Sequence, residues 1–202
     1  NNYLDCSKNT ILDKAKYISI FNLNNVKLEN DCIDTGKLNF SNIVVLFSLD
    51  IGSNNLNQIK FNYFSKNYFL TILNLSSNQI KFIEINSFGN QASLVQLNLK
   101  NNYLKIFCSC LFGKLSFLEK FQTNVYLEQN NLEQIDMIYY FKEFSLSNNQ
   151  LKKISIDNTT KFTFFDKLDL NHNLIESIES DQLISSTQLR YLYLRNNSIK
   201  YI

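Results

Sequence analysis

The sequence is poor in several residue types on which catalytic and phosphate-binding sites depend. Its 202 residues include four glycines, one histidine, and no tryptophan or proline. So few glycines leave no Gly-rich loop to cradle a phosphate group. The one histidine, His172, lies between two asparagines; Asp169 could reach it, but a general base also needs a pocket, so we interpret His172 as a solvated surface residue. We expect no enzyme, no cofactor and no metal site.

Charge and apolar runs exclude two further classes of protein. The formal net charge is +2 and the sequence pI is near 8.3, without the clustered Lys and Arg of a nucleic-acid binder. The longest apolar stretch, residues 43–47, is far too short to cross a bilayer. We expect no nucleic acid as partner and no membrane insertion by this segment.

The chain is dominated by an internal repeat of 24 residues. The frame Leu-x-x-Leu-x-Leu-x-x-Asn-x-Leu recurs, for example from Leu46 to Leu56 and from Leu94 to Leu104. Its first positions are Leu46, Leu70, Leu94, Leu118, Phe141, Phe165 and Leu189. A fixed period in the twenties is the signature of a solenoid, in which each unit buries its apolar side against its neighbours.

Within each repeat, apolar and polar residues alternate as in a strand with one buried face. Because successive units repeat one another, their strands run parallel, and the alternation leaves one face in water. We predict an α/β solenoid, a curved array with a parallel concave β-sheet and a mostly irregular convex side. Residues 1–17 would be an N-terminal cap remnant and residues 18–202 about eight repeats. The chain lacks a starting Met and stops just after an apolar strand, which favours a fragment whose C-terminal cap is missing.

One asparagine recurs in phase where each strand ends. An inward-pointing amide can bind turn backbone groups that the sheet no longer pairs. The predicted structural column consists of Asn54, Asn78, Asn102, Asn130, Asn149, Asn173 and Asn197.

A second column is expected to fill the convex half of the core. Its members lie six residues before each repeat start: Phe40, Phe64, Phe88, Phe112, Ile135, Thr159 and Leu183. The repeat length changes in one place, where residues 123–126 resemble a four-residue insertion beside a strand and the next convex segment is about five residues short. This irregularity is either a tolerated loop or a local bulge at a contact site.

The four cysteines fall into two groups. Cys6 and Cys32 flank the first, degenerate repeat, where a disulfide would close the array; free buried thiols, or a Cys6 bond to a cysteine upstream, are the alternatives. Cys108 and Cys110 lack the ligand count of a zinc site. We expect no bond between them, since two thiols two residues apart on a strand-like path close poorly.

These repeats resemble the leucine-rich repeat family, and among its members the 24-residue type found in the ectodomains of Toll-like receptors, Slit-type guidance proteins and variable lymphocyte receptors. The segment around Cys6 is similar to the end of the N-terminal cap of extracellular members. The absence of proline departs from the family pattern. The resemblance implies a non-enzymatic recognition module, part of a cell-surface or secreted receptor, that binds a protein, or a presented glycan or lipid, on its concave face. An intracellular scaffold or adaptor and a structural ectodomain spacer remain the alternatives.

The exposed strand positions change character along the array. Early repeats offer small or neutral groups such as Ser48 and Ser76, whereas the last two offer charged and aromatic ones. Tyr and Arg are enriched at binding hot spots. The candidate ligand-binding residues are Lys167, Asp169, His172, Arg190, Tyr191, Tyr193 and Arg195.

Overall fold

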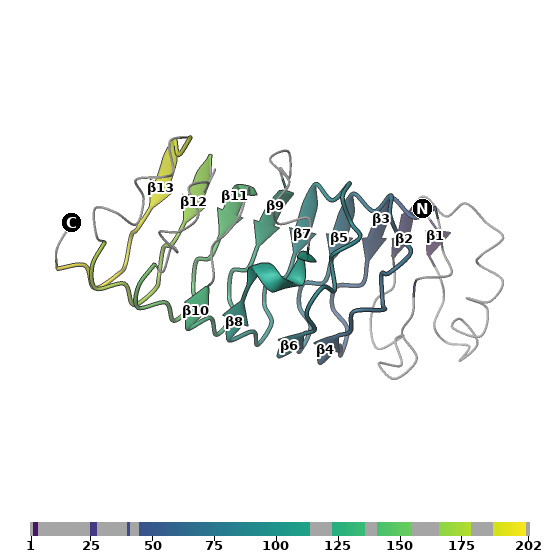
Figure 1. Ribbon diagram of the computed structural model, residues 1–202. Coiled ribbons are helices and arrows are strands. Elements are labelled where there is room, and N and C mark those ends of the chain that lie inside the picture. The colour runs from purple at the N-terminus through teal and green to yellow at the C-terminus, as the bar shows by residue number, and fades with distance from the viewer. Residues whose placement is uncertain are drawn as a thin grey trace.

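The computed structural model describes residues 2–3, 25–27, 40, 45–113, 123–135, 141–154, 166–178 and 188–200. In this part of the chain, nine strands form one parallel sheet in the order β1-β2-β3-β5-β7-β9-β11-β12-β13 (Figure 1). The strands are β1 (Asn2–Tyr3), β2 (Asn25–Lys27), β3 (Ser48–Asp50), β5 (Ile72–Asn74), β7 (Gln96–Asn98), β9 (Thr123–Tyr126), β11 (Phe141–Ser145), β12 (Lys167–Asp169) and β13 (Tyr191–Tyr193).

The opposite wall of the array carries little regular structure. Two short parallel pairs lie there: β4 (Gln58–Ile59) with β6 (Phe82–Ile83), and β8 (Ile106–Phe107) with β10 (Gln134–Ile135) (Figure 1). The described residues contain one 3-10 turn, η1 (Ser109–Leu111), and no α-helix. The predicted parallel-strand solenoid with a mostly irregular second wall is confirmed. None of these described elements is a helix that could span a membrane.

Side chains alternate between the buried and the solvent-facing side of the sheet. In β3, β7 and β12 the central leucine is fully buried while both neighbours reach toward solvent. Leu49, Leu73 and Leu97 lie side by side in register, 24 residues apart. The solvent-facing side of this nine-stranded sheet, the predicted concave side, is called the sheet face below.

The repeat assigned to Leu118 is placed differently from the prediction. Residues 123–126 are not an insertion: they form β9, and Val125 lies opposite Leu97. Leu118 itself lies outside the described residues. The prediction was wrong because the leucine frame does not fit this strand. Thr123 and Val125 fill its buried positions, and the Thr123 hydroxyl donates to the Leu94 carbonyl.

The next strand carries the bulge. Between Phe141 and Phe144 of β11 the register with β9 shifts, so that Phe141 lies opposite Thr123 and Phe144 opposite Val125. One extra residue on one strand of a pair accounts for such a shift.

Stacked phenylalanines fill the second half of the core. Ring centroids are 5.9 Å apart for Phe40 and Phe64, 6.2 Å for Phe64 and Phe88, and 5.6 Å for Phe88 and Phe112. The next member is Phe141, 5.7 Å from Phe112, and not Ile135 as predicted. Phe141 is the first residue of β11, while Ile135 pairs with Phe107 in the opposite wall. Thr159 and Leu183 lie outside the described residues.

The asparagine column connects successive repeats. Asn102 Nδ2 donates to the carbonyls of Leu99 and Lys100 in its own turn and of Leu75 in the preceding repeat, each at 3.1 Å. Its Oδ1 accepts from the Ile80 N–H at 2.9 Å. The same donor and acceptor pattern recurs at Asn78, Asn130, Asn149, Asn173 and Asn197, and Asn54 makes the bonds within its own turn.

The residue before each of these asparagines has a left-handed backbone. The φ angle is 52° at Asn101 and 54° at His172. The seven residues are Ser53, Ser77, Asn101, Gln129, Asn148, His172 and Asn196. Only glycine, and to a lesser degree Asn, Asp and His, adopts this region without a sizeable steric cost. The turn therefore constrains backbone as well as side chain, which the sequence frame did not reveal.

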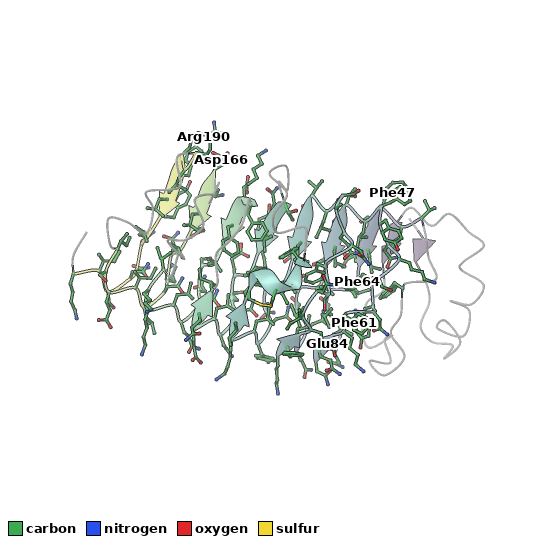
Figure 2. All side chains as sticks on the ribbon, in the orientation of Figure 1. Phe47, Phe61, Phe64, Glu84, Asp166 and Arg190 are labelled. Atoms are coloured by element: carbon green, nitrogen blue, oxygen red, sulfur yellow. A yellow bond between two sulfur atoms is a disulfide. The ribbon has the colours of Figure 1, made fainter. Side chains whose placement is uncertain are left out.

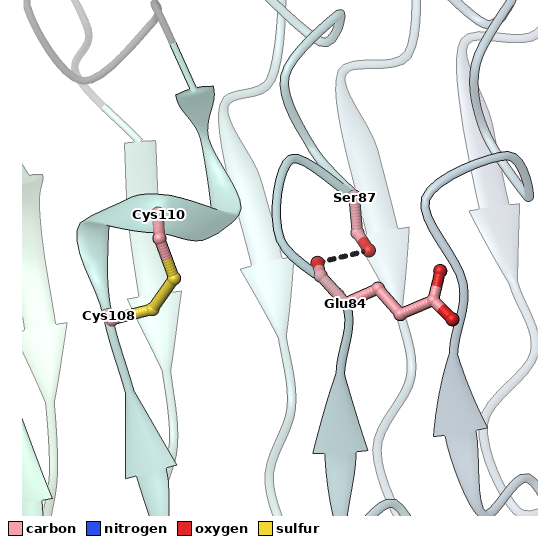
Figure 3. Close-up of a disulfide and its surroundings, with 4 residues drawn as sticks. All are labelled: Glu84, Ser87, Cys108 and Cys110. Carbon is pink, nitrogen blue, oxygen red and sulfur yellow. Dashed lines mark hydrogen bonds between the residues drawn. A yellow bond between two sulfur atoms is a disulfide. The ribbon is translucent and has the colours of Figure 1, made fainter.

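A disulfide joins Cys108 and Cys110, contrary to the prediction (Figure 3). The two cysteines do not lie on a straight strand-like path, because η1 begins at Ser109 and turns the chain. Their Cα atoms are 5.3 Å apart, within the range that a disulfide spans. Cys6 and Cys32 lie outside the described residues, so their pairing stays a prediction.

Candidate binding face

The sheet face consists of two parallel rows of side chains, one on each side of the buried central residues. The register places the row before the central residue at Ser48, Ile72, Gln96, Asn124, Glu143, Lys167 and Tyr191. It places the row after the central residue at Asp50, Asn74, Asn98, Tyr126, Ser145, Asp169 and Tyr193. Because the backbone ladder fixes these rows, their side chains are displayed on a rigid support.

The first part of this face is a closed polar ladder. Asp50 Oδ1 accepts from Asn74 Nδ2 at 2.8 Å and from the Gly52 N–H at 3.0 Å. Asn74 Oδ1 in turn accepts from the Ser76 hydroxyl at 2.7 Å. A Cβ at Gly52 would stand 3.0 Å from Asn74 Nδ2, so glycine leaves room for this ladder. These groups bond one another and offer little to a ligand.

A half-buried charged cluster occupies the centre of the face. Lys100 Nζ lies 4.8 Å from the centre of the Tyr126 ring and 3.0 Å from Glu128 Oε1. The pKa of the Tyr126 phenol is raised, chiefly by burial and then by the carboxylate of Glu143. A cation over a tyrosine ring and a partly desolvated ion pair hold these side chains in place.

Sequence reasoning did not single out Lys100, Tyr126, Glu128 or Glu143. All four belong to the strands β7, β9 and β11 or the turns that follow them, where the repeat length changes. The signal that could have found them is the buried Thr123 and Val125 pair, which sets the register of Tyr126 on the sheet face.

The last two strands bring most of the predicted binding residues together. Lys167 lies opposite Tyr191 and Asp169 opposite Tyr193 in the register of β12 and β13. Lys167 Nζ stands 5.7 Å from the centre of the Tyr193 ring. Both tyrosines and Arg190 are exposed.

Arg190 forms a two-point contact with Asp166 at the edge of this group, where Figure 2 labels both side chains. Arg190 Nη2 donates to Asp166 Oδ2 at 2.7 Å, and its Nε donates to Oδ1. This hydrogen bond, and then the charge of Arg190, lower the pKa of the Asp166 carboxyl. Asp166 was not among the predicted residues, yet it fixes the orientation of Arg190.

His172 and Arg195 lie in the turns beyond the strands. The His172 ring is exposed, with Nδ1 3.2 Å from Asn196 Nδ2. Asp169 Oδ1 instead accepts from the backbone N–H of Asn171 at 3.0 Å, and within the described turns no hydrogen bond joins Asp169 to His172. Asn171 Oδ1 accepts from the Arg195 N–H at 2.7 Å, which ties the two turns together. Among the described residues, the His172 ring thus contacts the Asn196 amide and not the Asp169 carboxylate.

The described part of the chain contains no group of three or more His, Cys, Asp or Glu residues that could hold a metal ion.

Comparison with known proteins agrees with this architecture. A family model described as leucine rich repeat matches residues 44–104. Residues 44–104 are leucine-rich repeats. The parallel ladder of the same sheet continues beyond that match through β9, β11, β12 and β13.

Three solved structures illustrate the similarity. A leucine-rich repeat protein from Bacteroides eggerthii is 16% identical with a TM-score of 0.62, and the match covers 92% of this chain and 38% of that one. A TLR13–ssRNA13 complex gives 22% identity and a TM-score of 0.74, over 93% and 28% of the two chains. The mouse RP105/MD-1 complex gives 19% identity and a TM-score of 0.65, over 88% and 30%. This chain thus spans well under half the length of these proteins, and the likeness shows the fold. No curated protein matches the sequence.

Proposed function

We propose that this leucine-rich repeat array is a non-enzymatic recognition module of a cell-surface or secreted receptor, of the 24-residue extracellular type. It would bind a protein ligand through the sheet face. The observation that carries the proposal is the group formed by Lys167 of β12, Tyr191 and Tyr193 of β13 and the adjoining Arg190. Large, oriented aromatic and Arg side chains are the residues that dominate binding energy at protein interfaces.

The charged cluster at Tyr126 supports the same surface. Tyr126 lies on β9, two strands from β12, and Glu143 of the intervening β11 faces Lys167. A continuous zone from Lys100 to Tyr193 would therefore meet the ligand, while the closed polar ladder at Asp50 would not. The RP105/MD-1 structure, a complex of a similar solenoid with another protein, supports protein binding in general.

Selection of ligands tests the proposal. Domains from a displayed library of secreted and cell-surface proteins would be selected on the wild-type chain. The selected binders would then be measured against a variant carrying Tyr193→Ala and Arg195→Ala. We expect this variant to weaken most binders by more than about fivefold per residue, the effect of losing a hot-spot contact.

A matched double variant, Ser48→Ala with Gln96→Ala, changes the same face in its first part and should leave binding within about twofold. Thermal melts of both variants should match the wild type. Binders that are indifferent to the Tyr193 and Arg195 changes would show that the ligand lies elsewhere on the solenoid.

The state of the cysteines tests the proposed extracellular location. Thiols would be counted under denaturing, non-reducing conditions in protein isolated from its natural source. Because Cys108 and Cys110 also form a disulfide, peptide mapping of the unreduced protein would locate the bonds. A Cys6–Cys32 disulfide supports the extracellular assignment, since such bonds persist in oxidising compartments. Four reduced thiols would favour the intracellular scaffold.

A further inference from the structure

Four large apolar side chains stand in solvent on the wall opposite the sheet face. Phe61, Phe82, Ile85 and Ile106, here called the outer patch, are 60%, 56%, 69% and 62% exposed. Phe82 and Ile106 occupy the same position in successive repeats, on β6 and β8, and Phe61 and Ile85 share another. In Figure 2, Phe61 and Glu84 lie at the wall of β4 and β6, away from Phe47 at the edge of the sheet.

The fold does not require apolar residues at these positions. The strand position of Phe82 and Ile106 is held by Gln58 and Gln134 in the flanking repeats. The core beneath is filled by the next residue of each strand, such as the buried Ile83 and Phe107. Packing of the repeats therefore does not require the apolar side chains of Phe82 and Ile106.

Hydrogen bonds of Glu84 fix the backbone at Phe61 and at the turn after β6. Glu84 Oε2 accepts from the Phe61 N–H at 2.9 Å, and the Glu84 N–H donates to the Ile59 carbonyl at 2.9 Å. The Ser87 hydroxyl donates to the Glu84 carbonyl at 2.6 Å (Figure 3). The Glu84 carboxylate thus accepts a hydrogen bond that positions the backbone of Phe61.

Lysines border the patch. Lys60, Lys81 and Lys105 directly precede Phe61, Phe82 and Ile106 in the chain. Lys105 Nζ lies 3.2 Å from Glu133 in an exposed pair, whereas no ion pair engages Lys60 or Lys81 among the described residues. Three lysines against the two carboxylates of Glu84 and Glu133 leave a formal net charge of +1 at the patch.

Size and composition identify the kind of surface that would cover the patch. Four side chains exposing roughly 100 Å² each give roughly 400 Å² of apolar surface, in the range of functional patches on monomers. Protein interfaces are rich in Tyr and Arg and poor in Lys, whereas Phe and other apolar groups with Lys around them are typical of surfaces that lie in a membrane interface. A second copy placed on the patch by two-fold symmetry would meet the same excess of lysines.

We infer that the outer patch docks on a bilayer surface that carries anionic headgroups. Phe61, Phe82, Ile85 and Ile106 enter the headgroup and acyl boundary, and Lys60, Lys81 and Lys105 contact lipid phosphates and carboxylates. Because the patch and the sheet face lie on opposite walls, docking leaves the proposed ligand surface open to solvent.

Flotation with vesicles tests this inference on the 202-residue chain. The probes are vesicles of phosphatidylcholine alone and of phosphatidylcholine with about a quarter phosphatidylserine. We expect the wild type to float with the anionic vesicles and not with the neutral ones, and to be released at high salt. Lys60→Gln with Lys81→Gln should lower the partition coefficient roughly 30-fold, and Phe82→Ser with Ile106→Ser by at least about tenfold.

Phe47→Ser with Ile72→Ser is the matched control, since it removes one exposed Phe and one exposed Ile away from the patch. It should keep binding within about twofold, and circular dichroism melts should show every variant folded. Failure of the wild type to bind anionic vesicles, or equal binding by the Phe82/Ile106 variant and the wild type, would overturn the inference. So would sedimentation that reveals a dimer which only the outer-patch variants dissociate, because the occupant would then be a second copy. Neither result bears on ligand binding at Tyr193.

Discussion

At the scale of single residues, the asparagine column does more than close a turn. The Asn102 amide bonds backbone groups of two successive repeats and is almost fully buried. A buried amide that loses its side chain leaves several backbone groups without partners, and each such group costs about 1–3 kcal/mol. The column is therefore a chain of links along the stack.

We expect Asn102→Ala to lower the free energy of unfolding by about 1–3 kcal/mol or more. The control is Asn101→Gly, because Asn101 is exposed and its φ of 52° suits glycine, whereas alanine would add backbone strain. The control should change stability by less than about 0.5 kcal/mol. Urea melts of both variants measure this, and equal losses would contradict the assigned role of Asn102.

The Asp166–Arg190 pair should make the stability of the fold depend on pH. The folded-state pKa of Asp166 lies below its ordinary value because Arg190 donates two hydrogen bonds to its carboxylate. The pair therefore stabilises the fold above the unfolded pKa, and that contribution is lost as the pH falls through the folded pKa.

Arg190→Gln should raise the pKa of Asp166 toward its ordinary value, as NMR titration of the carboxyl carbon would measure. Arg195→Gln, a change in the neighbouring turn, should leave the Asp166 titration in place. An unchanged Asp166 curve in the Arg190 variant would mean that the pair is not formed in solution.

At the scale of elements, the irregular repeat shows how the core tolerates a change of length. Phe141 of β11 contacts Phe112 and Phe144 and continues the stack of rings across the shortened segment. The bulge in β11 accommodates the mismatch in the sheet while both Phe141 and Phe144 stay buried.

Phe141→Ala should cost about 3–5 kcal/mol of stability, the range for truncating a buried phenylalanine. Phe61→Ala removes the same atoms from an exposed position and should stay within about 0.5 kcal/mol. Guanidinium melts compare the two. A small loss at Phe141 would show that Ile135 or another side chain completes the column instead.

At the scale of the whole molecule, stability comes from contacts between neighbouring repeats. Each strand of the sheet touches the strands on either side, so interior repeats have two partners and β13 has one described partner, β12. Leu97 in β7 is 0% exposed, whereas the equivalent Leu192 in β13 is 36% exposed.

Leu97→Ala should therefore destabilise the chain by about 2–5 kcal/mol, and Leu192→Ala by roughly half that or less, since Leu192 buries less surface. Denaturant melts at several protein concentrations measure both. Equal losses would mean that Leu192 is covered in solution, and a dependence on concentration would identify a second copy as the cover.

Much of the fold could be predicted from the sequence because each repeat forms the same structural unit, so the same pattern is observed several times. The leucine at each buried strand position and the asparagine after each strand recur in phase, and the strand alternation and parallel order follow from them. Local periodicity therefore sufficed for the solenoid, for the sheet along one wall and for the position of the candidate residues Lys167, Tyr191 and Tyr193 on it.

Tertiary structure decided what happens where the period fails. Val125 is aligned with Leu97, Phe141 takes the place expected for Ile135, and Cys108 bonds Cys110. The first two outcomes depend on which residues face each other across neighbouring repeats, and the third on the local turn at η1. A leucine frame with a fixed period does not show where a repeat of different length places its residues. The cluster of Lys100, Tyr126, Glu128 and Glu143 arises at that shift, because its members come from separate repeats and become neighbours only when the strands stack.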